Sequence, residues 1–294
     1  MCNSLKNKVF FSALFLSVML INSTAWAEVR VGVTAIRGEL QTLKRWEALG
    51  KYLSEEINQP VKIIALTSNS LIETALQGNL DFVLNTPVGT LLLIEKTQHI
   101  PLATLNTLNG TQFAGVIVSK KGSGIKTSED LKGKKIISMQ QSTSAGGYLF
   151  QLYHLKMKNI DPHKDFSSFK EGKNQDDLIM GVKIGLFDAA FVRSGILESL
   201  EKMGKIKMED FEIVDQRNDE GFPHLHTTIL FPEFYFSAKP SLDPQLISTM
   251  KQALLKLTPE HPATTTAEIK GFVEPISYEP IKILLQTLKI EPFN

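Results

Sequence analysis

The fold class is decided by residues 29–57, which read VRVGVTAIRGELQTLKRWEALGKYLSEEI. Valines at alternate positions of the first five residues have the period of two that indicates a β-strand. After Gly38 the period becomes helical, because apolar residues recur every three or four positions. Trp46 lies on this apolar stripe, so we expect it to pack in the core; lining of a ligand cleft is the alternative. A strand followed directly by an amphipathic helix is the unit from which α/β proteins are built.

The same alternation continues along the chain. Val61–Leu66 is a second strand, Ser70–Glu73 has the pattern of a capping box opening a helix, and Asp81–Asn85 is a short strand. Thr86 and Pro87 then have the pattern of an N-cap followed by proline in the first helical turn. Further strands are predicted at 100–106, 113–119, 135–139, 165–169, 187–192 and 211–215, and helices at 144–158, 176–185, 195–203, 243–257 and 278–289. This alternation predicts a parallel sheet with helices on both faces.

Two polar, turn-rich segments are candidate crossings between lobes: 106–112 (NTLNGTQ) and 215–223 (DQRNDEGFP). If both are hinges, residues 112–224 form an inserted lobe 2. Lobe 1 is then made from residues 28–111 together with 225–294. A single lobe is the alternative that these segments leave open.

The N-terminus has the order of a secretory signal peptide. Lys6 and Lys8 precede an apolar run from Val9 to Ile21, and Ala25-Trp26-Ala27 follows as a small-x-small cleavage site. A membrane-spanning helix needs about 20 apolar residues, which this run does not reach. We therefore expect residues 1–27 to be removed and the rest to reach the periplasm without membrane insertion. A permanent anchor is the alternative.

Composition excludes several classes of function. Basic and acidic residues number 32 and 31, so the chain has no general attraction for nucleic acid. Cys2, the single cysteine, lies in the predicted signal peptide, which leaves no disulfide and no thiolate metal ligand. The sequence has no G-x-S-x-G elbow, no P-loop and no G-x-G-x-x-G after a strand. We expect a binding protein without catalysis, cofactor or metal.

Ligands of open α/β sheets bind beyond the carboxyl ends of the strands. The residues expected there share small hydroxyl or amide side chains, with two arginines added: Arg37, Ser68, Asn69, Asn85, Thr86, Ser142, Thr143, Ser144 and Arg193. Such side chains suit hydrogen bonding to a compact polar anion.

Ser142, Thr143 and Ser144 are the most informative of these candidates. They stand where a helix begins and are followed by Ala-Gly-Gly, so backbone N–H groups and the positive end of the helix dipole could meet an anion. The alternative is that one serine caps the helix.

Arginine grips oxyanions with two parallel hydrogen bonds, so Arg37 and Arg193 could each contribute from one lobe. A salt bridge at the lobe rim is the alternative for each. His224 and His226 share a face if their segment is extended, but no third ligand has zinc-like spacing. We expect no metal site, and His226 is a further candidate ligand contact.

Five segments, in one order, carry a family resemblance: VRVGVTAIRG (29–38), DFVLNTP (81–87), STSAGGYL (142–149), GVKIGLFDAAFVRSGILE (181–198) and GFVEPISYEPIKILLQTLKIEPF (271–293). They resemble the phosphonate-binding family of periplasmic solute-binding proteins. Closer still, they resemble the periplasmic sensor domains of tetrathionate-type histidine kinases. The resemblance implies a type II periplasmic binding fold with two crossovers. It also implies oxyanion capture by the hydroxyl-rich helix start at 142–144.

The chain departs from the phosphonate pattern at three places. Two positions that are aromatic in phosphonate binders correspond to Ser68 or Asn69, and to Asn85. Where relatives carry a ligand histidine, this chain has Lys173-Asn174-Gln175. Phosphate, phosphite, phosphonate and sulfur oxyanions are all candidate ligands, and a non-anionic ligand is the alternative.

The expected function is capture of a small oxyanion between two closing lobes, as a monomer, for an ABC permease in the inner membrane. The alternative is a detached sensor subunit that signals its ligand state to a histidine kinase. An enzyme on the same fold is a third class.

Overall fold

The computed structural model describes residues 27–36, 38–219 and 221–294. The predicted signal peptide, apart from Ala27, lies outside the described residues, and so does the candidate ligand residue Arg37. Within the described ranges, no helix is long and apolar enough to cross a lipid bilayer.

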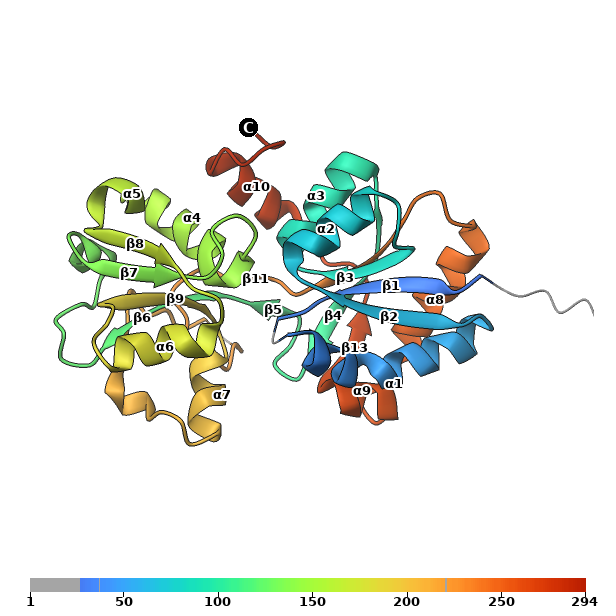
Figure 1. The fold of residues 1–294 in the computed structure, drawn as a ribbon, viewed down its shortest axis with the longest axis horizontal. Coiled ribbons are helices and arrows are strands. Elements are labelled where there is room, and N and C mark those ends of the chain that lie inside the picture. Colours follow the sequence, from blue (N-terminus) through green and yellow to red (C-terminus); the bar gives the residue numbers. More distant parts are fainter. Residues whose placement is uncertain (1–26, 37, 220) are drawn as a thin grey trace, which may run out of the picture.

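Two α/β halves lie side by side, each built on its own sheet (Figure 1). The first sheet has the strand order β13-β4-β12-β3-β1-β2. Its strands are β1 (Val29–Thr34), β2 (Val61–Leu66), β3 (Phe82–Asn85), β4 (Ile100–Thr107), β12 (Tyr235–Ala238) and β13 (Ile269–Val273). Its helices are α1 (Glu39–Ile57), α2 (Ser68–Leu76), α3 (Pro87–Thr97), α8 (Pro244–Lys256) and α9 (Pro262–Ala267). One apolar core joins α1, α8 and α9 to this sheet, and a second core joins α2 and α3 to its other face.

The second sheet has the order β10-β6-β9-β7-β8. Its strands are β6 (Gly115–Lys120), β7 (Lys135–Ser138), β8 (Ser168–Glu171), β9 (Ala189–Arg193) and β10 (Phe211–Ile213). Its helices are α4 (Phe150–Met157), α5 (Pro162–Asp165), α6 (Gln175–Lys183) and α7 (Ile196–Lys202). Side chains of α6 and α7 cover one face of this sheet, and side chains around α4 cover the other. Both faces need cover because successive apolar side chains along each strand point to opposite faces. Two sheets flanked by helices confirm the predicted fold class.

The chain crosses between the halves twice. Two short strands, β5 (Gln112–Phe113) and β11 (Phe231–Pro232), lie on the crossings and pair antiparallel with each other. A third apolar core covers them and includes the C-terminal helix α10 (Glu279–Thr287), which packs against α3 and α4. Within this core the rings of Phe150 and Phe231 stack with their centroids 3.9 Å apart. The residue bounds predicted for the two lobes stay a prediction.

Local sequence signals account for the helices that begin beside the junction of the halves. Thr86 is the N-cap of α3, its side chain accepts from the N–H of Gly89, and Pro87 stands in the first turn, as predicted. The stripe on α1 is buried from Trp46 to Ile57, whereas Leu40 at its start is exposed. Trp46 packs in the first core, which confirms the expected core packing, and it also lines the larger of the two cavities described below.

The prediction of parallel sheets was wrong, because both sheets are mixed. In the first sheet β12 and β13 run antiparallel to β4. In the second, β6 runs antiparallel to β9 and β10. Strand–helix alternation fixes direction only where a crossover helix joins two strands. β6 and β12 instead each follow a crossing between the halves, so they enter their sheets from the opposite end.

Three local predictions need correction. The capping box predicted at Ser70–Glu73 is wrong, because Thr67 caps α2 by accepting from the N–H of Ser70. The strand predicted at 165–169 lies at 168–171, since the turn of α5 precedes it. The helix predicted at 144–158 begins with a π-helical turn, Ala145–Leu149, before α4.

Candidate anion-binding cleft

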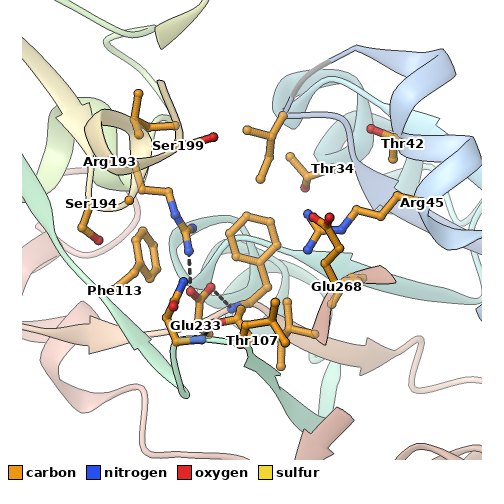
Figure 2. A pocket seen from close by; sticks show the side chains of 18 of the residues that line it. Thr34, Thr42, Arg45, Thr107, Phe113, Arg193, Ser194, Ser199, Glu233 and Glu268 are labelled. Atoms are coloured by element: carbon orange, nitrogen blue, oxygen red, sulfur yellow. Dashed lines mark hydrogen bonds and ion pairs between the residues drawn. The ribbon is translucent and has the colours of Figure 1, made fainter. Parts of the chain in front are cut away.

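Two adjoining cavities lie between the halves. The smaller, about 340 Å³, is called here the hydroxyl compartment, and its lining includes Thr34, Thr67, Ser68, Thr86, Thr143, Ser144 and residues 145–147. The larger, about 550 Å³, is called the arginine compartment and is lined in part by Thr42, Arg45, Ser199, Glu233 and Glu268 (Figure 2). His224 lines it too. Five residues line both cavities: Thr34, Ile36, Phe113, Arg193 and Phe234. The two compartments are therefore parts of one cleft.

Strand direction explains why three hydroxyl-bearing segments of the first half converge. β1, β2 and β3 are mutually parallel, so their carboxyl ends meet at one edge of the sheet. Thr34 ends β1, Thr67 and Ser68 follow β2, and Thr86 follows β3. α2 and α3 both begin at this edge, so the positive ends of their dipoles lie beside the hydroxyl compartment.

The second half contributes Thr143, Ser144 and the π-helical turn of residues 145–147. Ser144 is the N-cap residue, yet its side chain makes no capping hydrogen bond. The first donor inside the turn is the N–H of Leu149, which bonds to the carbonyl of Ser144 at 3.0 Å, and the N–H of Phe150 then bonds to the carbonyl of Ala145. Among the described residues, no acceptor is found for the backbone N–H groups of residues 145–147, although all three residues are buried. Buried N–H groups rarely stay unpaired, so an acceptor entering the cavity would complete them.

Packing holds this turn in place. The side-chain amide of Gln151, fully buried, donates to the carbonyls of Gly146, Val116 and Val192, which ties the turn to β6 and β9. A Cβ at Gly146 would lie 2.8 Å from the ring of Phe113, so the turn has no room for a larger residue there.

Asn85, which is fully buried, organises the opposite wall. Its Oδ1 accepts from the hydroxyl of Thr34 at 2.8 Å and from the N–H of Thr86 at 2.7 Å. Oγ1 of Thr86 in turn accepts from the N–H of Gly89 at 3.1 Å. The orientations of both threonines are therefore fixed from behind the cleft.

Arg193 stands at the boundary of the two compartments. Its guanidinium forms an ion pair with Glu233 on the link between β11 and β12, and its Cζ lies 3.9 Å from the ring centroid of Phe113 (Figure 2). The side chain of Glu233 is 2% exposed and that of Arg193 is 20% exposed. The sequence left two roles open for Arg193: binding the ligand, or forming a salt bridge at the rim of the lobes. Arg193 does form an ion pair, but the pair is buried where the two halves meet rather than exposed at the rim.

The arginine compartment carries charges of both signs. Arg45 donates through Nε to the carbonyl of Ala267 at 2.7 Å and lies over Trp46. Glu233 and Glu268 supply the negative charges of its lining. His224, which also lines it, has Nδ1 3.4 Å from Oε1 of Glu198 behind the lining. Burial acts to raise the pKa of Glu198, but contacts with His224 and with backbone N–H groups outweigh it and hold that pKa below its usual value.

The structure brings together some of the predicted ligand residues and leaves others aside. Those that line the cleft are Ser68, Thr86, Thr143, Ser144 and Arg193. Those that line neither cavity are Ser142, Asn69, Asn85 and His226. Ser142 is exposed, whereas His226 is buried with Nε2 3.3 Å from Asp219. A role in ligand binding stays a prediction for every one of these residues.

Thr34, Phe113 and Glu233 were missed from the sequence. Thr34 ends the first strand and therefore obeys the rule used for the other candidates. Glu233 had a signal too, since it is an isolated acid inside the apolar stretch 231–236 (FPEFYF). A buried acid needs a partner, and Arg193 provides it.

Comparison with known proteins identifies relatives of this chain. Residues 31–277 match the family model described as "ABC transporter, phosphonate, periplasmic substrate-binding protein". The tetrathionate sensor histidine kinase TtrS of Salmonella typhimurium is 29% identical over 252 residues, which is 82% of this chain and 42% of the kinase. The arginine-binding extracellular protein ArtP of Bacillus subtilis is 28% identical over 174 residues, 58% of this chain and 60% of ArtP. The chain thus matches 42–60% of the length of these two curated relatives.

Among solved structures, PhnD1 from Prochlorococcus marinus in complex with methylphosphonate superposes with a TM-score of 0.72. It is 18% identical, and the match covers 89% of this chain and 98% of that one. This likeness confirms the type II periplasmic binding fold. The matching family consists of substrate-binding proteins rather than enzymes. The chain belongs to the phosphonate family of periplasmic substrate-binding proteins of ABC transporters.

Proposed function

We propose that this protein captures a small oxyanion in the hydroxyl compartment, between two lobes that close on it. The observation that carries the proposal is the set of N–H groups at residues 145–147 together with the uncommitted hydroxyl of Ser144. Opposite them stand Ser68 and Thr86 at the first turns of two helices. Donors from both halves can thus surround one anion. Helix N-termini suit this role because their free N–H groups and the positive end of the helix dipole attract negative charge.

Neutral donors carry most of this site. Among the described residues two cations line the compartment, Arg193 and Lys173, and the carboxylate of Glu171 lines it too. Arg193 already pairs with Glu233, so its charge is largely balanced inside the protein. An oxyanion would be held mainly by hydrogen bonds and helix dipoles, which favour a compact anion with several acceptor oxygens. The neighbouring arginine compartment leaves room for a substituent on that anion.

An ABC permease is the first partner that we propose, because the matching family serves such transporters. A histidine kinase is the second candidate. It is favoured by the match of 82% of this chain to part of TtrS, whose name describes a tetrathionate sensor. Ligand-dependent stimulation of a permease ATPase, or of kinase autophosphorylation, would separate the two partners.

We further propose that the protein acts in the periplasm as a monomer, after cleavage between Ala27 and Glu28. Its lobes would be 28–111 with 225–294, and 112–224. N-terminal sequencing of exported protein should find Glu28 first. A retained N-terminus in the membrane fraction would contradict the cleavage proposal.

A thermal-shift screen of ligand-stripped protein tests the proposed ligand class. A ligand that binds only the folded state at 100 times its dissociation constant stabilises the protein by about 2.7 kcal/mol. For a chain of this size that corresponds to a rise in melting temperature of roughly 5–10 °C. We expect this rise with methylphosphonate, phosphate or another small oxyanion. If amino acids raise the melting temperature and no oxyanion does, the proposed ligand class is wrong.

A further inference from the structure

We propose that Thr34 makes the hydroxyl compartment selective for an oxyanion that still carries a proton, such as a phosphonate monoanion, over a fully ionised sulfonate. This inference rests on the proposed function and names the ligand class within it. It follows from the direction of the hydrogen bonds behind the cleft.

The side-chain amide of Asn85 can be oriented in one way only. A single atom of this amide lies 2.7 Å from the backbone N of Thr86 and 2.8 Å from Oγ1 of Thr34. Because a backbone N–H can only donate, that atom is the oxygen, Oδ1. An amide oxygen can only accept, so the hydroxyl proton of Thr34 is committed to Asn85. The hydroxyl of Thr34, a residue that lines the cleft, therefore keeps lone pairs but has no free proton for a ligand.

Turning the Thr34 hydroxyl towards a ligand would carry a penalty. Oδ1 of Asn85 is fully buried and would lose one of its two donors. Asn85 cannot swing to compensate, because its amide packs against Gly89 so closely that a Cβ there would overlap it. Thr34 is itself only 6% exposed. The acceptor character of Thr34 is thus built into the fold.

Most other groups identified around the compartment are donors. Oγ1 of Thr86 accepts from Gly89, which leaves its proton free for a ligand. The N–H groups of residues 145–147, for which no acceptor is found among the described residues, are donors too, and so is the ammonium group of Lys173, which also lines the compartment. A second acceptor, the carboxylate of Glu171, is exposed and accepts from the N–H of Gln141. An oxyanion therefore meets donors on most sides and a lone pair at Thr34.

A protonated oxygen matches this arrangement, and a bare oxygen does not. The P–OH group of a phosphonate monoanion can donate to Oγ1 of Thr34 while its other oxygens accept from the donors. A sulfonate has the same shape and charge, but it would set an acceptor oxygen against the lone pairs of Thr34. Sites that bond a ligand proton reject the analogue that lacks it, because a buried group is then left unpaired.

Methylphosphonate and methanesulfonate form a matched pair of probes for this inference. We would titrate both into ligand-stripped full-length mature protein by calorimetry at about pH 5, below the second pKa of about 6 of phosphate-type groups. Each probe then has one negative charge. We expect methylphosphonate to bind at least about tenfold more tightly. In Thr34→Val, which keeps the shape and removes the acceptor, this preference should fall towards equality. Thr34→Ser, which keeps the hydroxyl, should retain it.

The outcomes separate this inference from the proposed function. Equal affinity for the two probes in the wild-type protein, or a preference for the sulfonate, would overturn the role of Thr34 and leave oxyanion capture standing. Preference that survives unchanged in a folded Thr34→Val protein would also overturn it. Failure of both probes, and of phosphate and sulfate, to bind the wild-type protein would overturn the proposed function and this inference together.

Discussion

Arg193→Met should lower the free energy of unfolding by about 3–5 kcal/mol, because it leaves the carboxylate of Glu233 buried without its cation. The side chain of Glu233 is 2% exposed, so water cannot replace the guanidinium. The variant also removes the cation that lies over the ring of Phe113 on β5. The midpoint of urea unfolding measures this loss.

The double variant Arg193→Met with Glu233→Gln removes both charges and should recover most of that stability. Lys256→Met is the matched control, since it breaks an ion pair with Glu56 in which the lysine side chain is 69% exposed. Exposed pairs contribute at most about 1 kcal/mol, so this control should change little. A loss in Arg193→Met no larger than in the control would show that the buried pair does not brace the junction.

The pair also bears on how the cleft works. Arg193 comes from the end of β9, whereas Glu233 and Phe113 lie on the two crossings. The second half is thus attached to the crossings by an ion pair as well as by the apolar core around Phe231. We expect lobe movement to take place around this fixed point.

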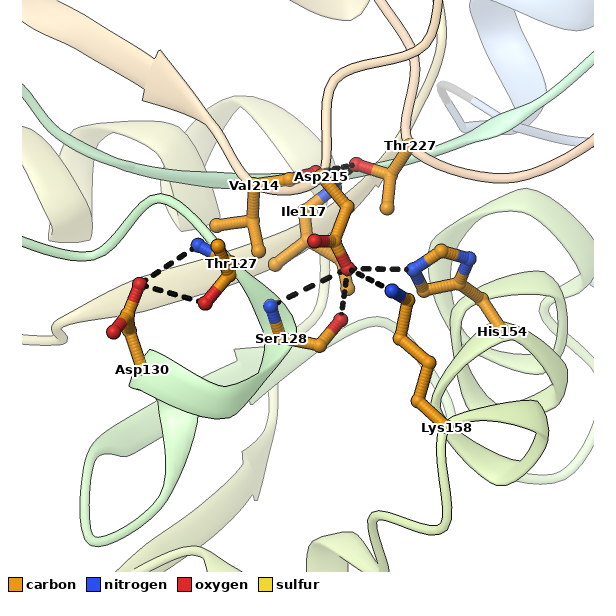
Figure 3. Close-up of polar contacts among 9 residues, drawn as sticks. All are labelled: Ile117, Thr127, Ser128, Asp130, His154, Lys158, Val214, Asp215 and Thr227. Carbon is orange, nitrogen blue, oxygen red and sulfur yellow. Dashed lines mark hydrogen bonds and ion pairs between the residues drawn. The ribbon is translucent and has the colours of Figure 1, made fainter.

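A second polar network, partly buried, joins α4 to two loop segments of the second half. Asp215 accepts from the N–H and hydroxyl of Ser128, and it contacts His154 at 2.9 Å and Lys158 at 3.4 Å (Figure 3). Burial acts to raise the pKa of Asp215, but these contacts outweigh it and hold that pKa below its usual value. Asp215 begins the polar segment that was predicted as the return crossing.

Local signals in the sequence were sufficient for the elements that face the cleft. The change of period after residue 38 predicted β1 and α1, and Thr86 with Pro87 predicted the start of α3. Such features depend on residues a few positions apart, so one sequence can reveal them. The rule that ligands bind beyond strand ends then selected Ser68, Thr143 and Ser144, which the fold does place in one compartment.

Features that depend on distant residues could not be predicted in this way. β12 and β13 were missed because they pair with β3 and β4, which lie more than 130 residues earlier in the chain. The pairing of Arg193 with Glu233 joins residues 40 positions apart, and neither residue signals the other. The π-helical turn at 145–147 depends on the hold of Gln151 on β6 and β9. Ser142 and Ser144, which precede the turn, predicted an ordinary α-helix start and gave no sign of a π-helical turn.

Ser144→Ala should raise the dissociation constant for methylphosphonate by at least about tenfold, since a hydrogen bond to a charged group contributes about 1.5–3 kcal/mol. Thr143→Ala should act in the same direction but less strongly, because Thr143 lines the same compartment while its hydroxyl has a long hydrogen bond, 3.4 Å, to Oε1 of Gln140. Neither variant should unfold the protein. The hydroxyl of Ser144 makes no capping bond, so the loss of about 1 kcal/mol typical of a removed cap is not expected.

Calorimetric titration of methylphosphonate into ligand-stripped Ser144→Ala protein, with its melting temperature recorded on the same sample, tests the anion site most directly. Lys156→Ala, an exposed change on α4, is the control and should bind as the wild-type protein does. The anion site predicts weakened binding at an unchanged melting temperature. Wild-type affinity combined with a lowered melting temperature would show that Ser144 caps a helix and that the anion binds elsewhere.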